Sequence, residues 1–517
     1  MKQYDVLEID LMGCDPGNDW VNVNVLAEFV LNGKHYTRKG FYAGKGRYIV
    51  RFMPEEPGIL RYKVSGIVQA AGEKQVEPAS EDKHGIVKAE GTVFRYQDGT
   101  KYLPFGTTVY ALLHQEHQVV EQTMETMKGS PFNKIRFCVF PKHFAFNDNE
   151  PKLFAFEKNE EGSWDVNHPC MEFWEELELR ISQFDEMGVQ VDLILFHPYD
   201  HWGFMHLNRD ECLTYLEYVI RRISAYPNVW WSLANEYDQM TDFTKERWEE
   251  MAAFLGRNDG GGHLLSNHNF VHPWDFSNTD TTHVCLQNAD APKIPALFRK
   301  FGKPVIYDEL GYEGNIPYSW GNLSAFEMVN RFWKIVCYGG YATHGETYMD
   351  DMNDNQCLWW SKGGILKGQS MKRIGFLRKL TESFPGTPVL FKPEDSLQIE
   401  SRVQLNQMLE QNIPGVSDNP VYICMSNMTD EEFTHMLEFF TDPVIHVGKE
   451  VYLKYFGDMC TIYGKMQLPE DHLYTVEVID VWEMTRAVAA EHVNGILEVK
   501  LPGKPGIAIL AARETGE

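Results

Sequence analysis

The feature that most constrains this chain is a regular alternation of short apolar runs with amphipathic helical stretches in its middle part. The helical period is clear where Phe173, Leu177, Ile181 and Phe184 recur three or four positions apart. Eight strand–helix units over roughly 300 residues match the size of a (β/α)8 barrel. The expected strands are 106–111, 134–140, 189–196, 229–234, 263–266, 283–286, 305–307 and 341–343.

A doubly wound parallel sheet is the alternative arrangement of such units. It would carry a glycine-rich phosphate-binding turn after its first strand. No such turn follows residues 106–111. The pattern therefore favours the barrel.

The segment before the barrel has the pattern of antiparallel strands. Val21, Val23 and Val25 alternate with polar residues, and Gly and Pro residues bound the later runs 48–53 and 59–64. We expect a β-sandwich at 1–84, with the polar stretch 70–83 serving as its linker to the barrel.

A second β-sandwich is expected at 386–517, after the barrel domain at 85–385. Its predicted strands are 422–425, 435–440, 451–455, 473–482 and 496–499. The predicted fold class is thus α/β, a (β/α)8 TIM barrel flanked by N-terminal and C-terminal β-sandwich domains.

Charge and cysteine content exclude several functions. The net charge of −26 repels phosphate backbones and anionic lipids, so we expect neither a nucleic-acid nor a membrane partner. No run approaches the ~20 apolar residues of a membrane span, and the first residues lack the pattern of a secretory signal. The nine cysteines are scattered without a CxxC pair, as expected of reduced thiols in a cytoplasmic protein.

Two glutamates end predicted barrel strands. Catalytic groups in such barrels stand at the C-terminal ends of the strands. Glu236 follows the fourth strand, within Asn235-Glu236, and Glu309 ends the seventh. The two side chains should therefore face each other across the mouth of the barrel.

Two facing carboxylates are what glycosidic bond cleavage requires. One donates a proton to the departing oxygen, and the other stays charged to meet the anomeric carbon. Retaining enzymes hold the pair ~5–5.5 Å apart and inverting enzymes ~6.5–9.5 Å apart. The alternatives are an inverting hydrolase on the same barrel, a non-catalytic sugar-binding protein, and two ordinary solvated loop acids.

Asn235-Glu236 and Glu309 resemble the catalytic positions of clan A retaining glycoside hydrolases. Further motifs are similar to the apiosidase-like bacterial glycosidases, a group that includes proteins named as cellulases and combines two β-sandwiches with a central barrel. The resemblance implies double displacement, with Glu236 as acid/base and Glu309 as nucleophile. In apiosidases proper the acid/base position can be Asp, and having Glu at this position weakens the inference that this chain takes their particular substrate. The motifs are 106–110 (GTTVY), 140–142 (FPK), 147–151 (NDNEP), 196–200 (FHPYD), 304–314 (PVIYDELGYEG), 340–348 (GYATHGETY) and 358–364 (LWWSKGG).

Polar and aromatic residues near the strand ends form the predicted substrate-binding set. Arg136 in the second strand is expected to hydrogen-bond Glu309, the alternative being a structural ion pair lower in the barrel. Asn235 is expected to bind the sugar 2-hydroxyl. His197 is expected to donate to sugar hydroxyls, and Trp202 to offer an apolar platform.

Glu346, after the eighth strand, is expected to bind a sugar hydroxyl and to raise the acid/base pKa by like-charge proximity. Trp360, beside Trp359, is a candidate sugar-stacking wall or plain core. The rest of the predicted substrate-binding set is Tyr110, Lys142 and His268. Asp308 and Glu313 flank the nucleophile and are the natural comparison residues.

No metal or cofactor is expected. The sequence lacks an HExxH motif, and the oxygen-rich stretch 350–354 lacks the glycine and terminal glutamate of an EF-hand loop. GxSxG, Walker and GxGxxG motifs are missing too, which excludes serine hydrolases, P-loop enzymes and Rossmann dehydrogenases.

These features together predict a retaining glycosidase acting on short glycosides or oligosaccharides. The insertions 143–172 and 199–209 could close one end of the cleft, which favours exo action. The flanking sandwiches are expected to brace the barrel or to form a homo-oligomer interface.

Overall fold

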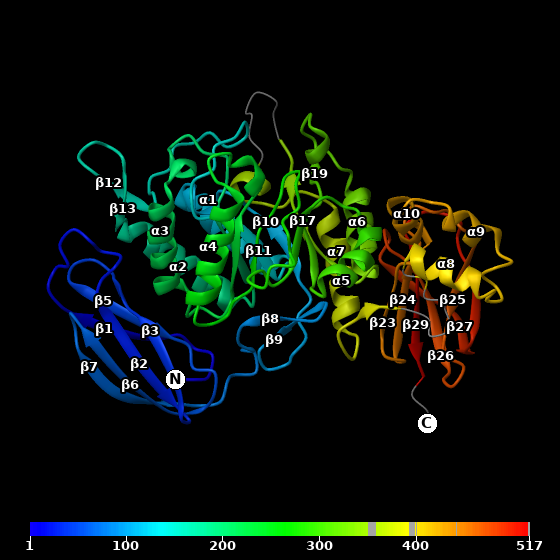
Figure 1. The fold of residues 1–517 in the computed structure, drawn as a ribbon, viewed down its shortest axis with the longest axis horizontal. Coiled ribbons are helices and arrows are strands. Elements are labelled where there is room, and N and C mark those ends of the chain that lie inside the picture. The colour runs from blue at the N-terminus through cyan, green and yellow to red at the C-terminus, as the bar shows by residue number, and fades with distance from the viewer. Residues whose placement is uncertain (350–357, 392–398, 400, 441, 515–517) are drawn as a thin grey trace.

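A computed structural model describes residues 1–349, 358–391, 399, 401–440 and 442–514. The chain forms three parts in a row, with a helix-covered barrel in the middle and a β-rich part on either side (Figure 1). The stretch 350–354, singled out above, lies outside the described residues. None of the described helices combines the length and the apolar character that crossing a bilayer requires.

The middle part contains all eight predicted strands as one parallel sheet, which confirms the TIM barrel. The two ends of the sheet meet where the Thr282 N–H donates to the Leu265 carbonyl at 2.8 Å, and where Ser266 Oγ donates to the His283 carbonyl. The strands are β10 (Phe105–Thr108), β11 (Lys134–Cys138), β14 (Gln190–Phe196), β15 (Val229–Ala234), β16 (Leu265–Ser266), β17 (Val284–Gln287), β18 (Val305–Glu309) and β20 (Tyr341–His344).

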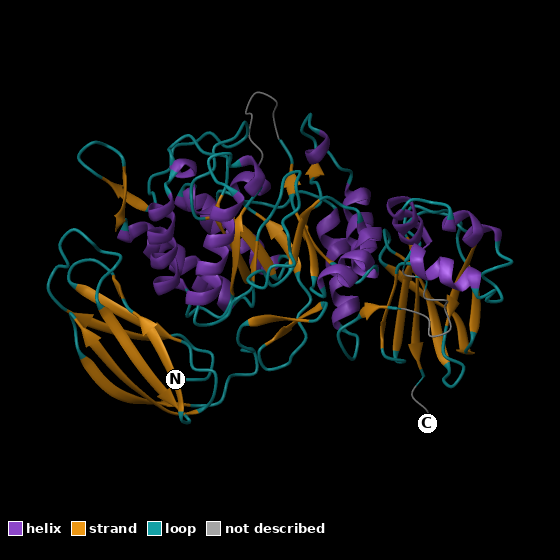
Figure 2. Cartoon of the chain, viewed as in Figure 1, coloured by secondary structure: helices purple, strands orange, loops and turns teal. Residues whose placement is uncertain are grey.

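Helices cover the outside of these strands (Figure 2). Side chains cap three of them, α3, α4 and α6: Asn208, for example, caps α3 by accepting from the N–H groups of Asp210 and Glu211. The connection between β16 and β17 contains no α-helix, so the predicted alternation is interrupted once. The helices are α1 (His117–Gly129), α2 (Met171–Glu186), α3 (Arg209–Ile223), α4 (Lys245–Asn258), α5 (Ile294–Phe301), α6 (Ala325–Cys337) and α7 (Ser370–Glu382).

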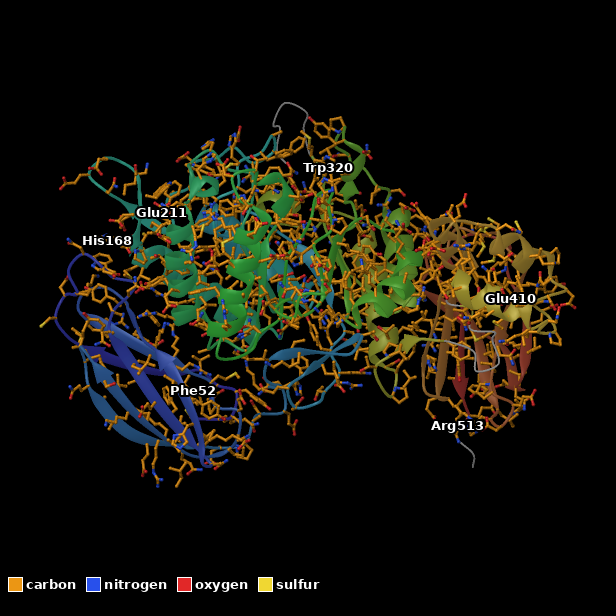
Figure 3. All side chains as sticks on the ribbon, viewed as in Figure 1. Phe52, His168, Glu211, Trp320, Glu410 and Arg513 are labelled. Carbon is orange, nitrogen blue, oxygen red and sulfur yellow. The ribbon has the colours of Figure 1, made fainter. Side chains whose placement is uncertain are left out.

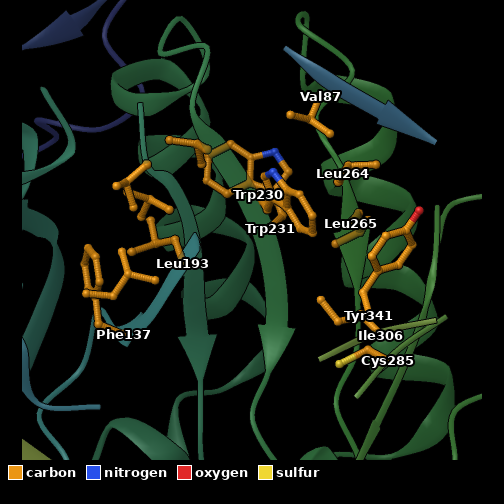
Figure 4. Packing of buried hydrophobic residues seen from close by; sticks show 14 of the residues in the cluster. Val87, Phe137, Leu193, Trp230, Trp231, Leu264, Leu265, Cys285, Ile306 and Tyr341 are labelled. Carbon is orange, nitrogen blue, oxygen red and sulfur yellow. The ribbon is translucent and has the colours of Figure 1, made fainter. Parts of the chain in front are cut away.

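A hairpin of β8 (Val87–Glu90) and β9 (Val93–Tyr96) packs against the barrel core near the N-terminal ends of the strands. Its Phe94 ring lies 5.0 Å from Trp230 and 5.1 Å from Tyr341, centroid to centroid. Figure 4 shows Val87 and Trp230 within this packed layer. The hairpin thus contributes to the hydrophobic core on the side away from the strand ends that carry Glu236 and Glu309.

The N-terminal part is a sandwich of two antiparallel sheets. Phe29 of one sheet stacks on Phe52 of the other at 4.4 Å. The expected linker at 70–83 is wrong over its first half, because 70–76 forms an edge strand. An edge strand exposes most of its side chains and is polar for that reason. The sheets are β1 (Leu7–Met12), β5 (Arg47–Phe52) and β4 (Phe41–Tyr42), then β3 (Lys34–Lys39), β2 (Val25–Leu31), β6 (Gly58–Gly66) and β7 (Ala70–Val76).

The C-terminal part is also built on two antiparallel sheets. Tyr452, Met466 and Leu497 belong to the buried core between them. The predicted strands 451–455, 473–482 and 496–499 are present with small shifts of their ends. The sheets are β22 (Val389–Leu390), β23 (Val444–Val447), β24 (Val451–Tyr455), β29 (Ile507–Arg513), β26 (Tyr474–Asp480) and β27 (Thr485–Val493), then β25 (Tyr463–Gln467) with β28 (Ile496–Lys500).

Two predicted C-terminal strands, 422–425 and 435–440, are wrong. They lie in helices, which pack around Leu405, Met425 and Phe433. Apolar runs this short do not separate strand from helix. The cap at Asn419, whose side chain accepts from the Val421 N–H, is the signal that would have distinguished them. The helices are α8 (Arg402–Glu410), α9 (Pro420–Ser426) and α10 (Asp430–Phe440).

Both flanking parts are fastened to the barrel by buried polar contacts. On the N-terminal side, Arg51 and Arg222 both bond Glu178 of α2, and all three are buried. On the C-terminal side, the Tyr455 hydroxyl donates to Asn330 of α6 at 3.0 Å. Buried polar groups paired in this way fix the position of each flanking domain against the barrel.

Candidate active site

Glu236 lies two residues after the end of β15, in a left-handed backbone conformation with φ of 53° and ψ of 52°. Such a conformation is uncommon for a residue with a side chain, and it persists only where its surroundings hold it. The carboxylate accepts from Gln287 Nε2 at 3.0 Å, from Gln239 Nε2 at 2.9 Å and from the Tyr199 hydroxyl. The strained turn therefore ends in a carboxylate fixed by three donors.

The environment of Glu236 favours its protonated form. Burial, followed by the negative charge of Glu309, raises the pKa of Glu236 to about 7. Lys142, Tyr199 and Gln287 act in the opposite direction and only partly offset this. At neutral pH this side chain is therefore able both to donate and to accept a proton.

Glu309 reaches the same region through an irregular strand end. The register between β17 and β18 shifts by one residue, because Leu286 pairs with Tyr307 and Gln287 pairs with Glu309. Such a bulge changes the direction of the side chains that follow it. As a result, Asp308 bonds Lys134 within the barrel, while Glu309 Oε2 accepts from the Tyr110 hydroxyl at 2.8 Å.

The two glutamates lie in one electrostatic environment. Glu309 is the largest charged contributor to the pKa shift of Glu236, and both carboxylates act on Lys142. Glu236 is 3% exposed and Glu309 is 9% exposed. The structure therefore brings the pair together at the carboxyl ends of the fourth and seventh strands, with little water around either group.

Asn235 links the pair to the barrel interior. Its Oδ1 lies 3.1 Å from the Tyr110 hydroxyl and 3.5 Å from Arg136 Nη2. Its Nδ2 is buried and has no hydrogen-bond partner among the residues that the structure describes. An amide donor left unsatisfied beside a pair of carboxylates is available to a substrate hydroxyl.

Arg136 does not make the predicted bond to Glu309 among the described residues. Its Nη1 donates to the Asp308 carbonyl at 3.3 Å, and its Nε lies 3.4 Å from Asp192. Lys134 Nζ lies 2.6 Å from both Asp192 and Asp308. Arg136 therefore belongs to a buried network of two cations and two carboxylates, which is the alternative interpretation of this residue.

Lys142 occupies a cage of aromatic rings. Its Nζ lies 3.5 Å from the ring centre of Tyr110, 4.2 Å from Tyr199 and 4.7 Å from Trp360. Burial lowers the pKa of Lys142. The cage keeps a positive charge beside the two glutamates. Trp360 is thus part of the wall around Lys142, whereas Trp359 is buried and donates to Thr107.

The two predicted histidines differ in their surroundings. His268, after β16, is fully buried, and within the described part of the chain neither of its ring nitrogens has a hydrogen-bond partner. Burial holds its pKa well below the usual value, so the ring is neutral. His197 Nε2 instead lies 3.1 Å from the Phe140 carbonyl, and burial lowers the pKa of His197 to about 4.

The hydrogen bonds of Trp202 and Glu346 are made to other residues than the two glutamates of the candidate site. Trp202 Nε1 donates to Glu150 at 2.9 Å, and its ring packs among residues of the two insertions. Glu346, in β21 (Glu346–Thr347), accepts from the N–H groups of Lys367 and Gly368. It is not among the main contributors to the pKa shift of Glu236, contrary to expectation.

Glu346 belongs instead to a buried cluster with Glu313 and His344. Their potential metal-ligand atoms lie within 4.8 Å of one another. The Glu313 oxygens already accept from Tyr348 Oη, from the N–H of Gln369 in the loop before α7 and from the N–H of Ser370, the first residue of α7. Because these hydrogen bonds occupy the carboxylate, we interpret the cluster as the anchor of that loop.

Sequence reasoning missed several residues that hold the catalytic pair. Gln287 ends the sixth strand, and the same strand-end rule that found Glu309 would have found it. Tyr199 stands within the quoted motif 196–200, without a role assigned to it. Tyr312, whose hydroxyl lies 3.3 Å from that of Tyr110, likewise stands within the quoted motif 304–314 without a role assigned to it. Trp320, whose ring lies 5.3 Å from that of Trp360, carries no signal of its own in the sequence.

A barrel of eight parallel strands, with one glutamate after the fourth strand and another ending the seventh, defines the class of protein: an O-glycosyl hydrolase with a clan A barrel. The chain belongs to the family with an apiosidase-like catalytic domain, which matches residues 88–387. Two domains of unknown function, DUF5060 and DUF5605, match residues 1–66 and 440–511.

Solved structures share this arrangement. One named "putative glycoside hydrolase", from Bacteroides vulgatus ATCC 8482, is 30% identical and covers 99% of this chain and 99% of its own, with a TM-score of 0.83. A glycoside hydrolase family 5 structure from the same organism is 14% identical, covers 84% of this chain and 94% of its own, and has a TM-score of 0.58, which is a likeness of fold alone. No curated protein matches the sequence.

Proposed function

We propose that this chain is a retaining glycosidase, with Glu309 as nucleophile and Glu236 as acid/base. The observation that carries the proposal is the unequal environment of the two glutamates. Burial raises the pKa of Glu236 to about 7, whereas Glu309 accepts a hydrogen bond from Tyr110 and is the charge that disfavours ionisation of Glu236. Unequal carboxylates are what divide the acid role from the nucleophile role.

In the first step a carboxylate oxygen of Glu309 attacks the anomeric carbon while Glu236 gives its proton to the leaving oxygen. The glycosidic bond breaks, and an ester forms between the sugar and Glu309. In the second step Glu236, now ionised, takes a proton from water as the water attacks the same carbon. The ester breaks, the sugar leaves with unchanged anomeric configuration, and both glutamates return to their starting states.

Unpartnered polar atoms support sugar binding at this site. Asn235 Nδ2 and the ring nitrogens of His268 are buried and have no partner among the described residues. A sugar hydroxyl placed against them would satisfy groups that otherwise remain costly to bury. In this proposal the Asn235 amide binds the 2-hydroxyl, a contact that strengthens in the transition state.

Contacts between the two insertions support exo action on short substrates. The His143 N–H donates to the Tyr199 carbonyl at 2.8 Å, and Trp164 Nε1 donates to the Trp202 carbonyl at 2.8 Å. Trp202 in turn donates to Glu150. The loops after β11 and β14 are therefore joined, as expected of a wall that closes one side of the catalytic centre.

The proposal is tested with a panel of aryl glycosides, including an aryl apioside because of the family's description. Once a substrate is found, Glu236→Ala and Glu309→Ala should each lose about 10²–10⁴-fold in kcat while remaining folded. Azide should rescue Glu309→Gly and give a product of inverted configuration. If either alanine variant keeps more than ~1% of the activity, the corresponding role is wrong.

An inverting mechanism on the same barrel is the competing proposal. Proton NMR of the first product separates the two, because a retaining enzyme releases the anomer that it received. Tight sugar binding by the wild-type protein without any turnover would instead favour a sugar-binding protein.

A further inference from the structure

A series of aromatic rings leads outward from the nucleophile. Tyr110, which bonds Glu309, lies 5.8 Å from Trp360 between ring centres. Trp360 lies 5.3 Å from Trp320, and Trp320 lies 5.8 Å from Tyr318. The first two rings are buried, Trp320 is half-buried, and Tyr318 is 47% exposed. The series therefore runs from the catalytic centre to solvent.

The two outer rings are fixed in place by the backbone of their loop. Trp320 lies in the short 3-10 turn η5 (Ser319–Gly321), and its carbonyl accepts from the Tyr312 N–H at 2.7 Å. The Gly321 carbonyl accepts from Thr347 Oγ1 at 2.6 Å. A Cβ at Gly321 would lie 2.4 Å from the Ile316 side chain, so a larger residue there requires Ile316 to move. Figure 3 places Trp320 at the outer edge of the barrel, near β19 (Glu313–Gly314).

The loop that carries Tyr318 and Trp320 is suited to an uncharged ligand. Segment 314–323 contains no Asp, Glu, Lys, Arg or His. The ring planes of Tyr318 and Trp320 are parallel within 4° and offer apolar faces. Flat, fixed aromatic faces bind the apolar face of a sugar ring or an aryl group, with little loss of side-chain freedom.

The position of Trp320 and Tyr318 indicates which half of the substrate, the transferred sugar or the leaving group, these two rings contact. The sugar that is transferred must contact Glu309, Asn235 and Lys142, which are buried. The rings farther out, beside solvent, are left for the group that departs. We propose that Trp320 and Tyr318 form an aglycone-binding platform, which takes a neutral sugar ring or an aryl group as the leaving half of the substrate. This inference rests on the proposed function of Glu236 and Glu309.

Two substrates with the same sugar separate the platform from the catalytic centre. An aryl glycoside has an aromatic leaving group that can stack on the two rings. The leaving group of a glycosyl fluoride is a fluoride ion, which cannot stack. Trp320→Ala and Tyr318→Ala should lower kcat/KM for the aryl glycoside about three- to tenfold, mainly through KM, as expected for the loss of one ring contact. Both variants should hydrolyse the fluoride within about twofold of the wild-type rate.

Controls exclude trivial causes. Tyr463→Ala removes a ring of similar exposure, 51%, from β25 in the C-terminal part, and should change neither rate. Trp320→Phe keeps a ring against Trp360 and should recover most of the lost activity. Equal losses on both substrates, or no loss on the aryl glycoside, would overturn the platform while leaving the catalytic assignment intact. A wild-type enzyme inactive on every fluoride and aryl glycoside would overturn both.

Discussion

The hydroxyl of Tyr110 donates to Oε2 of Glu309 at 2.8 Å, and this bond connects the first barrel strand to the seventh. The Tyr110 hydroxyl has only one proton to donate, and Glu309 Oε2, at 2.8 Å, is nearer to it than Asn235 Oδ1, at 3.1 Å. We therefore assign the proton to the bond with Glu309. Burial raises the pKa of Tyr110 well above its usual range, so it remains a donor at every working pH. In the free enzyme this bond stabilises the negative charge on Glu309.

Replacing Tyr110 by Phe should therefore lower kcat. A hydrogen bond to a charged group contributes about 1.5–3 kcal/mol, which corresponds to a loss of roughly 10- to 150-fold. Steady-state kinetics on the best aryl glycoside measures the effect, with Tyr463→Phe as the comparison variant, because it removes a hydroxyl from β25 of the C-terminal part, outside the barrel. An unchanged kcat in Tyr110→Phe would contradict this role for Tyr110.

The pH profile should report the ionisation of Glu236. The acid must be protonated for the first step, and burial raises the pKa of Glu236 to about 7. We therefore expect kcat/KM to decline as pH rises through about 7. The Lys142 charge lowers the pKa of Glu236, so Lys142→Met should move this alkaline limb to higher pH. A limb that stays in place or moves to lower pH in the variant would show that another group is titrating.

Stability should also depend on the protonation of Glu236. Its folded-state pKa lies above its unfolded value of 4.5, so the folded protein binds the proton more tightly and loses stability as pH rises from about 4.5 to 7. Glu236→Gln should remove this loss. We expect the variant to gain on the order of 3 kcal/mol over the wild type between pH 4.5 and pH 8.

Urea unfolding at both pH values measures this gain. Burial also raises the pKa of Glu346 to about 7, so the wild type and the variant share that contribution and only their difference reports on Glu236. If the variant and the wild type lose the same stability between the two pH values, the raised pKa is wrong.

The buried network below the catalytic pair should contribute strongly to stability. Asp308 pairs with Lys134 at 2.6 Å, and both are fully buried. Asp308→Asn leaves two buried cations, Lys134 and Arg136, to share the single carboxylate of Asp192 and should cost roughly 3–5 kcal/mol. The exposed pair of Lys449 and Asp471, at 2.7 Å, offers the matched control Asp471→Asn, which should change stability far less than Asp308→Asn because solvent screens the pair. Equal losses in the two variants would contradict the structural role of Asp308.

Local patterns in the sequence predicted the barrel because each of its strands is a short apolar run with helical stretches beside it. These patterns failed where a strand is polar, and where an apolar run is too short to distinguish a strand from a helix. The edge strand 70–76 exposes its side chains, and the helices α9 and α10 contain apolar runs too short to assign.

For the site, the rule that catalytic groups end barrel strands was enough to select Glu236 and Glu309. It could not predict how each side chain is aimed, because the left-handed turn at Glu236 and the bulge before Glu309 depend on tertiary contacts. The same limit explains Arg136, whose partner was expected to be Glu309. The choice between Glu309 and the neighbouring Asp308 is made by side-chain geometry alone.

The central claim is that Glu309 forms a covalent bond to the sugar. The most direct measurement is to incubate the enzyme with a 2-deoxy-2-fluoro glycoside of the preferred sugar, carrying an activated leaving group, and to locate the label by peptide mass spectrometry. We predict one sugar per chain, attached to Glu309 in the wild type and missing in Glu309→Gln. A label on Asp308 or Glu313, or turnover with inversion and no label, would contradict the account.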